Sequence, residues 1–235
     1  MTDLRDLLVL QQRDTAVDQL RHRRATLAER TLVTGLQDEL ARLRTELASA
    51  TGERDALAAR QERLEADVAA GEAKRRTLES RLASTSVPRE AQAMSEEIDG
   101  IRARQVVLED EELEIMEALE PIETAVAAGQ AQEVALDRRL SEGREALARA
   151  ETAVDGEIAD ALVARADAVQ PIPSALLERY ERLRTKLGGV AVATLDGARC
   201  TGCNLALPTV ELERVRGAGP DTIVECEQCG RILVR

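Results

Sequence analysis

Phenylalanine and tryptophan are absent from this chain of 235 residues, and tyrosine occurs once, at Tyr180. Aromatic side chains supply much of the large buried area in the core of a globular domain. A chain that lacks them, yet is 44% apolar and 32% charged, is better suited to extended helix packing, for which Leu, Ile, Val and Ala suffice. The composition therefore favours long paired helices over a compact fold with an enclosed catalytic pocket.

Histidine is limited to His22, which lies in the basic segment 21–24. Acid–base catalysis needs a positioned partner and a substrate site, and a single histidine among arginines offers neither. We expect this segment to be a solvated helix face. We also expect the protein not to be an enzyme.

Long apolar runs are missing as well. No segment approaches the length that spans a membrane, and residues 1–5 do not begin an apolar signal segment. We therefore expect a cytoplasmic protein without a membrane anchor. In that reducing compartment structural disulfides are rare.

Positive charge is in short supply, because the net charge is −12. Such a chain repels phosphate and loses the counterion release that drives non-specific binding to nucleic acid. The charge is uneven: residues 96–120 hold ten acidic and two basic residues, whereas residues 196–235 hold five Arg against six Asp or Glu. The predicted contacts with nucleic acid or a partner are the arginines of this last segment, namely Arg199, Arg214, Arg216, Arg231 and Arg235.

Cysteine occurs four times, always in the last 36 residues, as Cys200-x2-Cys203 and Cys226-x2-Cys229 with 22 residues between the pairs. Two such pairs can place four thiolates at the corners of one tetrahedron, which is the arrangement a structural zinc ion accepts. Iron in a four-cysteine site is chemically compatible with the same ligands. A redox pair or a disulfide framework fits the pattern less well, because neither explains two matched pairs in a cytoplasmic protein.

The module around the cysteines is small enough that a metal decides its stability. About 40 residues of short strands and turns bury too little area to fold alone. Gly202 and Gly230 allow the backbone to turn tightly around the sulfurs. We predict one structural Zn²⁺ per chain, and four thiolates leave no open coordination position for water activation.

A heptad pattern runs through most of the preceding chain. Alternate steps of four and three residues from Leu36 reach fourteen positions up to Leu82, and ten of these are Leu, Val or Ala. The same steps from Ile98 reach seventeen positions up to Val154, with more interruptions. A period of 3.5 residues is the signature of a left-handed coiled coil, in which polar seam residues often fix register.

The pattern stops at residues 84–88. Pro88 disfavours helical geometry at Val87 and suits the first turn of a new helix, and the serines nearby offer capping hydroxyls. The two arms, roughly residues 3–83 and 88–168, match in length. We predict a mostly α fold: an antiparallel coiled-coil helical hairpin over residues 1–170, with a kink or local break at Pro121.

Two prolines within Gln170–Pro173 end the second arm. Residues 171–189 are predicted to form a connection that contains a short capped helix, Ser174–Arg184, ended by a Gly-Gly pair. Residues 190–235 are predicted to form the small β-rich zinc ribbon, with strands at 190–193, 223–224 and 232–234 and a helical turn at 207–216. Tyr180 is expected to pack between hairpin and ribbon, because its ring is apolar and its tip polar.

The residues also resemble a known family. Cys200-Thr201-Gly202-Cys203, a following Leu-Pro, and Cys226-Glu227-Gln228-Cys229-Gly230-Arg231-Ile232-Leu233 resemble the terminal ribbon of bacterial coiled-coil proteins with a C4-type zinc-ribbon domain. Residues 7–24, 87–90 and 108–113 look like the helical hairpin of that family, so the resemblance covers nearly the whole chain. It implies adaptor or nucleic-acid-binding roles, in some members linked to flagellar regulation or secretion, and it implies no enzyme activity.

Two functions are compatible with these observations. The first is a non-enzymatic zinc-binding adaptor that binds a protein partner through its rod and ribbon. The second is a regulatory protein whose ribbon binds DNA or RNA, although the lack of aromatics removes the usual stacking platforms. An antiparallel hairpin can satisfy its seam within a monomer, but the leftover apolar residues Val106, Val107, Leu113 and Met116 could pair chains into a homodimer.

Overall fold

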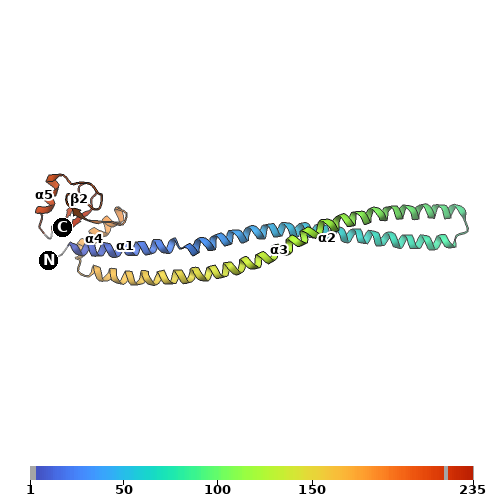
Figure 1. The fold of residues 1–235 in the computed structure, drawn as a ribbon, viewed down its shortest axis with the longest axis horizontal. Coiled ribbons are helices and arrows are strands. Elements are labelled where there is room, and N and C mark those ends of the chain that lie inside the picture. The colour runs from blue at the N-terminus through green and yellow to red at the C-terminus, as the bar shows by residue number, and fades with distance from the viewer. Residues whose placement is uncertain (1–3, 220–221, 235) are drawn as a thin grey trace. The chain divides into compact units, whose positions relative to one another are not determined.

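Long helices dominate the computed structural model of the protein, which describes residues 4–219 and 222–234. Helices α1 (Arg5–Ala25) and α2 (Ala28–Ser84) precede the reversal, and α3 (Pro88–Val169) follows it (Figure 1). By its internal contacts the chain divides into two compact units, Val33–Glu142 and Met1–Leu32 with Gly143–Arg235. The predicted helical hairpin is confirmed, and the predicted domain boundaries at 170 and 189 stay predictions.

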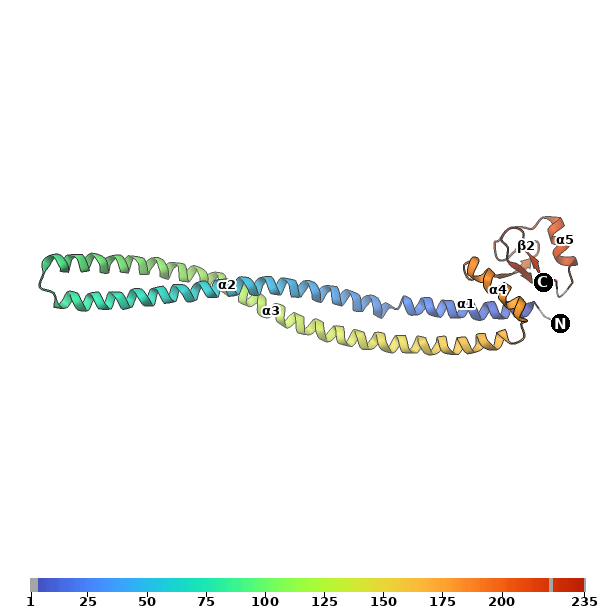
Figure 2. The ribbon, with the colours of Figure 1, turned by 180° about the vertical axis from the view of Figure 1, so that it is seen from behind.

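The unit Val33–Glu142 is a pair of antiparallel helices, formed by α2 and the first part of α3, which lie side by side in both views (Figures 1 and 2). Its reversal occupies residues 85–87. Thr85 supports the turn, because its backbone N–H donates to the carbonyl of Arg81 and its hydroxyl accepts from the N–H of Val87. A core cluster formed by Leu64, Leu108, Ile115 and Leu119 lies between the helices.

The predicted seams are confirmed by burial. All fourteen positions of the first seam and all seventeen of the second are buried or half-buried. Gly129 shows why a glycine stands in a seam: a Cβ there would lie 2.6 Å from Cδ2 of Leu47. The missing side chain is therefore the hole that receives a leucine from the facing helix.

Pro121 does not break the second arm, although a local break was one of the two outcomes predicted there, the other being a kink. Helix α3 is continuous from Pro88 to Val169, with Pro121 inside it. Both Pro121 and Glu117, whose carbonyl loses its helical donor, are exposed. Water can satisfy that carbonyl, so the missing hydrogen bond is tolerated.

The first arm, in contrast, is interrupted where a single helix was expected. Helix α1 ends at Ala25 and α2 begins at Ala28. Thr26 closes α1, because both its backbone N–H and its hydroxyl donate to the carbonyl of His22, at 3.0 and 2.9 Å. The hydroxyl bond does not by itself explain the interruption, because Thr15 and Thr45 make the same bond to the carbonyl four residues before them inside continuous helices.

Helix α4 (Ser174–Lys186) lies in the other unit and confirms the predicted short helix. Its N-cap residue is Pro173 rather than a capping serine, and it makes no side-chain cap hydrogen bond. Gly188 and Gly189 follow with φ of 70° and 101°. These left-handed conformations suit glycine and end the helix as predicted.

The core of this unit joins the helical part to the ribbon. Tyr180 is fully buried in a cluster that draws residues from α1, α4 and two strands. Its packing between hairpin and ribbon is therefore confirmed. The buried members of the cluster are Leu4, Leu7, Leu10, Ile172, Leu176, Tyr180, Ala191, Val192, Ile232 and Val234.

The ribbon contains a four-stranded sheet in the order β2-β1-β4-β3. Strand β1 (Val192–Asp196) pairs in parallel with β4 (Ile232–Val234) and antiparallel with β2 (Arg199–Cys200). Strand β3 (Val224–Glu225) pairs antiparallel with β4, and helix α5 (Thr209–Gly217) lies between β2 and β3 in the chain. The strand predicted at 190–193 begins two residues later, the one predicted at 223–224 begins one residue later, and β2 was not predicted at all.

Candidate metal centre

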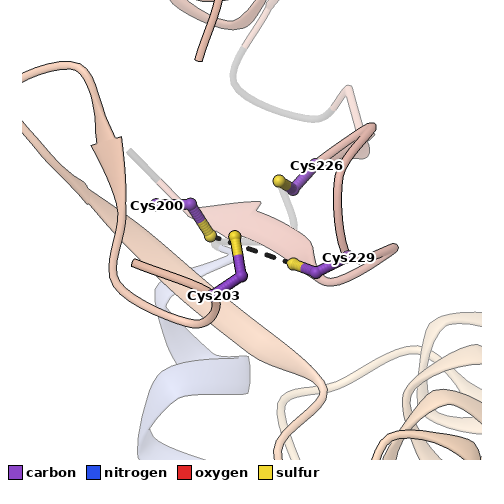
Figure 3. Close-up of side chains that lie close together, drawn as sticks. All are labelled: Cys200, Cys203, Cys226 and Cys229. Atoms are coloured by element: carbon purple, nitrogen blue, oxygen red, sulfur yellow. Dashed lines mark hydrogen bonds between the residues drawn. The ribbon is translucent and has the colours of Figure 1, made fainter. Parts of the chain in front are cut away.

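The four cysteine side chains point toward one another from two tight turns (Figure 3). We call the turn at residues 200–203 the first knuckle and the turn at residues 226–229 the second knuckle. Cys200 ends β2 and Cys203 lies in the turn that follows it, whereas Cys226 follows β3 and Cys229 lies just before β4. Because β1 and β4 are neighbours, the sheet holds the two knuckles beside each other. The four predicted ligands are thus brought to one place, although the two pairs lie 23 to 29 positions apart in the chain.

The sulfur atoms have the spacing that a tetrahedral metal site requires. All four Sγ atoms lie within 4.8 Å of one another, and Cys200 Sγ is 4.0 Å from Cys229 Sγ. Zinc–sulfur bonds of about 2.3 Å place tetrahedral sulfurs about 3.8 Å apart. The cysteines are therefore positioned for zinc binding, with only a small contraction needed on coordination.

The turns around the sulfurs use glycine in two different ways. Gly230 has φ of 72°, and its N–H donates to the carbonyl of Cys226 at 2.7 Å. Gly202 does not need an unusual φ; a Cβ there would lie 2.4 Å from Cδ of Arg231 and 3.0 Å from Cβ of Ala193. The left-handed residue of the first knuckle is instead Asn204, with φ of 61°, a conformation that asparagine tolerates.

Burial and hydrogen bonding shift the thiol pKa values in opposite directions. Burial raises the pKa of Cys200 and raises that of Cys226 to about 12. Burial opposes ionisation of Cys229 as well, but hydrogen bonds from the backbone and side chain of Arg231 outweigh it and lower the pKa of this thiol. A divalent cation binds thiolates, so a bound metal offsets the burial that disfavours charged sulfur at Cys200 and Cys226.

Glu211 is a buried carboxylate beside the second knuckle that the sequence analysis did not single out. It is 3% exposed, and its Oε1 accepts a hydrogen bond from the N–H of Glu227 at 2.8 Å. That N–H directly follows Cys226, so the carboxylate of Glu211 ties α5 to the knuckle. No local signal marks this role, because Glu211 lies in a helix with other charged residues.

The arginines that were predicted to contact nucleic acid or a partner form hydrogen bonds or ion pairs within the ribbon or next to it. Arg199 donates to the carbonyl of Asn204 at 2.7 Å, and Arg216 donates to that of Gly197 at 3.3 Å. Arg231 donates from Nε to the carbonyl of Val190 at 2.9 Å. Arg214 forms an ion pair with Glu227 at 2.8 Å, and Arg235 lies outside the described residues.

Gln11 joins helix α1 to the first strand of the ribbon. Its Oε1 accepts from the backbone N–H groups of Ala191 and Val192, at 2.8 and 2.6 Å, and its Nε2 donates to the carbonyl of Val192 at 2.8 Å. The side-chain amide thus pairs with the backbone as a neighbouring strand would. These three bonds fix the sheet, and with it the knuckles, to α1.

A buried polar cluster around Asp14 reinforces this junction. Asp14 is 2% exposed; it accepts from the hydroxyl of Tyr180 at 2.6 Å and from Nε of Arg165 at 2.5 Å. Nε of Arg184 lies 3.5 Å from the same carboxylate. The sequence carried a signal for Asp14. Positions 7, 10, 14 and 17 have the spacing of one buried helix face, and Asp14 is the charged residue among them.

With this geometry in place, the chain can be compared with known proteins. Residues 10–188 match the CT398-like coiled coil hairpin domain, and residues 199–233 match the C4-type zinc ribbon domain. The chain belongs to the CT398-like family. The resemblance found in the sequence is therefore confirmed for both parts.

Relatives in the CT398-like family match over nearly their whole length. The uncharacterized protein Rv2229c of Mycobacterium tuberculosis is 29% identical over 241 residues, which cover 98% of this chain and 94% of that protein. A solved structure from Mycobacterium smegmatis is 26% identical with a TM-score of 0.87, covering 98% and 96% of the two chains.

CT398 of Chlamydia trachomatis itself shares the fold, at 20% identity and a TM-score of 0.79, with 98% and 96% of the two chains covered. The HP0958 protein of Helicobacter pylori does so at 16% identity and a TM-score of 0.55, with 99% and 98% covered. These two likenesses show that the fold of the whole chain recurs in solved structures. Within the described part of the chain, none of the helices has the length and apolar character needed to cross a membrane.

Proposed function

We propose that this CT398-like protein is a non-enzymatic zinc-binding adaptor that presents surfaces of its ribbon and hairpin to a protein partner. The observation that carries the proposal is the closed set of four sulfurs within 4.8 Å of one another. Four thiolate ligands fill the coordination sphere of zinc, so the metal organises a surface instead of activating water. We further propose one zinc ion per chain, since the described residues contain one such cluster.

The attachment of the ribbon to α1 supports an adaptor role. Gln11 bonds to the first strand of the ribbon through partly buried hydrogen bonds, and the buried bond between Asp14 and Tyr180 joins α4 to α1 beside it. A ribbon fixed in this way presents its surface in a defined orientation. Preorganisation of that kind lowers the entropy cost of binding a partner.

The charges favour a protein partner over DNA or RNA. Arg199, Arg214, Arg216 and Arg231 each donate to a carbonyl or carboxylate of the chain. Binding phosphate would require some of these bonds to be exchanged, and the net charge of −12 opposes approach of a polyanion. The contact residues proposed here are the exposed ribbon side chains Leu205 and Val210, with relative exposures of 51% and 80%.

A crosslinking experiment in native cells tests the adaptor function. The full-length protein, the variant Cys229→Ser and the double variant Leu205→Ser/Val210→Ser are tagged and compared. We expect specific protein crosslinks with the parent protein and their loss in both variants, while the double variant keeps its zinc. Absence of any protein partner, or binding of DNA or RNA that weakens steeply as salt rises, would contradict the proposal.

A further inference from the structure

Helix α3 carries large apolar side chains that are exposed to solvent in the unit Val33–Glu142. Val106, Leu113 and Met116 are 57%, 57% and 50% exposed. They lie away from the seam that packs Leu108 and Ile115 against α2. The hairpin core therefore does not require these three apolar side chains, and leaving them in water is unfavourable.

The exposed apolar residues share one face of the helix with carboxylates. At 3.6 residues per turn, positions 106, 109, 110, 113, 116, 117 and 120 fall within about 120° of the helix circumference. We call this surface the α3 stripe; its members are Val106, Glu109, Asp110, Leu113, Met116, Glu117 and Glu120. It extends for about 20 Å along the helix, which is close to four turns of a partner helix.

The carboxylates of the α3 stripe lie in a segment of α3 that lacks basic residues. Within residues 4–219 and 222–234 they form no side-chain ion pair, and α3 contains neither Lys nor Arg between Arg104 and Arg138. Farther along the same helix Glu133 and Asp137 both pair with Arg44 of α2, at 2.6 and 3.0 Å. Among the described residues, the negative charge of the stripe thus has no paired cation.

A surface of this kind selects its occupant by charge. Nucleic acid and anionic lipid are repelled. A second copy that paired its own α3 stripe symmetrically would place carboxylates opposite carboxylates, which is unfavourable across an interface. The complementary occupant has apolar residues at helical spacing flanked by Lys or Arg.

We propose that the α3 stripe is a docking site for a basic amphipathic helix of a protein partner. Leu113 and Met116 contact the apolar face of that helix, and the flanking carboxylates pair with its cations. The inference rests on the proposed adaptor function, and it adds the place and the chemistry of one contact. Charge pairing makes the association fall as ionic strength rises.

The first test maps the segment that touches the stripe. A photo-crosslinking residue replaces Leu113 in the full-length protein, and the crosslinked peptide from native cells is identified by mass spectrometry. The matched control places the same residue at Val134, which is 72% exposed on the same helix. We expect position 113 to crosslink a segment of another protein with net positive charge and apolar residues three and four apart, and position 134 to crosslink it far less.

The second test reverses the charge of the stripe. The triple variant Glu109→Lys/Glu117→Lys/Glu120→Lys should lower the crosslink yield at position 113 by about tenfold or more, because like charges then face each other. The control, Glu46→Lys/Glu53→Lys/Glu62→Lys, changes net charge equally at exposed positions of α2 and should leave the yield nearly unchanged. Circular dichroism checks that both variants remain helical.

Several outcomes would overturn the inference. These are crosslinks from position 113 to a copy of this chain, to nucleic acid or to a segment without positive charge, and an unchanged yield after charge reversal. No crosslink at position 113 would overturn it as well. If the ribbon still captures a protein in that case, the adaptor function stands; if no position captures one, both proposals fail.

Discussion

The hairpin and the ribbon of this protein are stabilised in opposite ways. The hairpin spreads its packing over a seam in which fourteen positions of α2 are buried or half-buried, so no single side chain decides the fold. The ribbon gathers its stability around four sulfurs within 4.8 Å and a small core. A repetitive seam tolerates local defects such as Pro121, whereas a module built on one centre does not.

Loss of one sulfur should produce the largest difference between the two regions. We expect Cys229→Ser to unfold the ribbon and leave the hairpin helical, because structural zinc contributes on the order of 10 kcal/mol to the folding of small domains. The measurement is an NMR spectrum of the full-length protein together with circular dichroism. A folded ribbon in this variant, with native amide shifts for β1 and β4, would refute the expectation.

Removal of the buried carboxylate at the junction should have the next largest effect. Asp14→Ala leaves Tyr180, Arg165 and Arg184 without their shared partner, which costs about 3 kcal/mol or more. Hydrogen exchange of α4 measures this loss. The control is Asp155→Asn, which removes an exposed partner of Arg24 and should change the exchange of α4 very little; equal effects of the two variants would contradict the role given to Asp14.

Loss of the hydrogen bond between Glu211 of α5 and the second knuckle should have a smaller effect than Cys229→Ser or Asp14→Ala. Glu211→Ala leaves the N–H of Glu227 without its acceptor, so we expect zinc affinity to fall about 10- to 100-fold, as is typical when a group that orients a metal ligand is lost. Competition with a chelator measures the affinity. Glu213→Ala, at an exposed position of the same helix, is the matched control, and an equal loss there would show that Glu211 has no special role.

The smallest predicted effect depends on pH. Burial and then the hydrogen bond to Asp14 raise the pKa of Tyr180 far above its ordinary value, so the folded state keeps a proton that the unfolded state releases near pH 10. The stabilising contribution is complete below about pH 10 and is lost as pH rises further. Tyr180→Phe should cost about 1–2 kcal/mol at neutral pH.

The free energy of unfolding, compared between the parent protein and Tyr180→Phe from pH 8 to pH 11.5, tests this prediction. The difference between the two should shrink above about pH 10, where unfolded tyrosine ionises. A difference that is constant across this range would mean that the hydroxyl of Tyr180 is not buried against Asp14.

The same contrast explains which features the sequence could predict. Periodicity reports contacts that repeat, so it predicted the hairpin, its reversal and the burial of seam positions from Leu36 to Leu82. The C-x2-C pairs predicted the sulfur cluster because their chemistry is specific. The break between Ala25 and Ala28 was not predicted, because a heptad count registers repeated contacts and not a local end of a helix.

Contacts between distant residues were the least predictable. Arg231 was expected to contact a partner, yet its stem covers Gly202 and its Nε donates to the carbonyl of Val190. Strand β2 has two residues and exists because Leu195 pairs with Cys200. Such features follow from the tertiary arrangement and leave no periodic trace in the sequence.

Metal analysis coupled to hydrogen exchange tests the central claim most directly. The purified full-length protein should contain about one zinc per chain, bound by the single cluster of four cysteines. On removal of the metal, amide protection should disappear from β1 to β4 and persist in α2 and α3. Iron in place of zinc, no metal with intact thiols, or a ribbon that stays protected without metal would contradict the account.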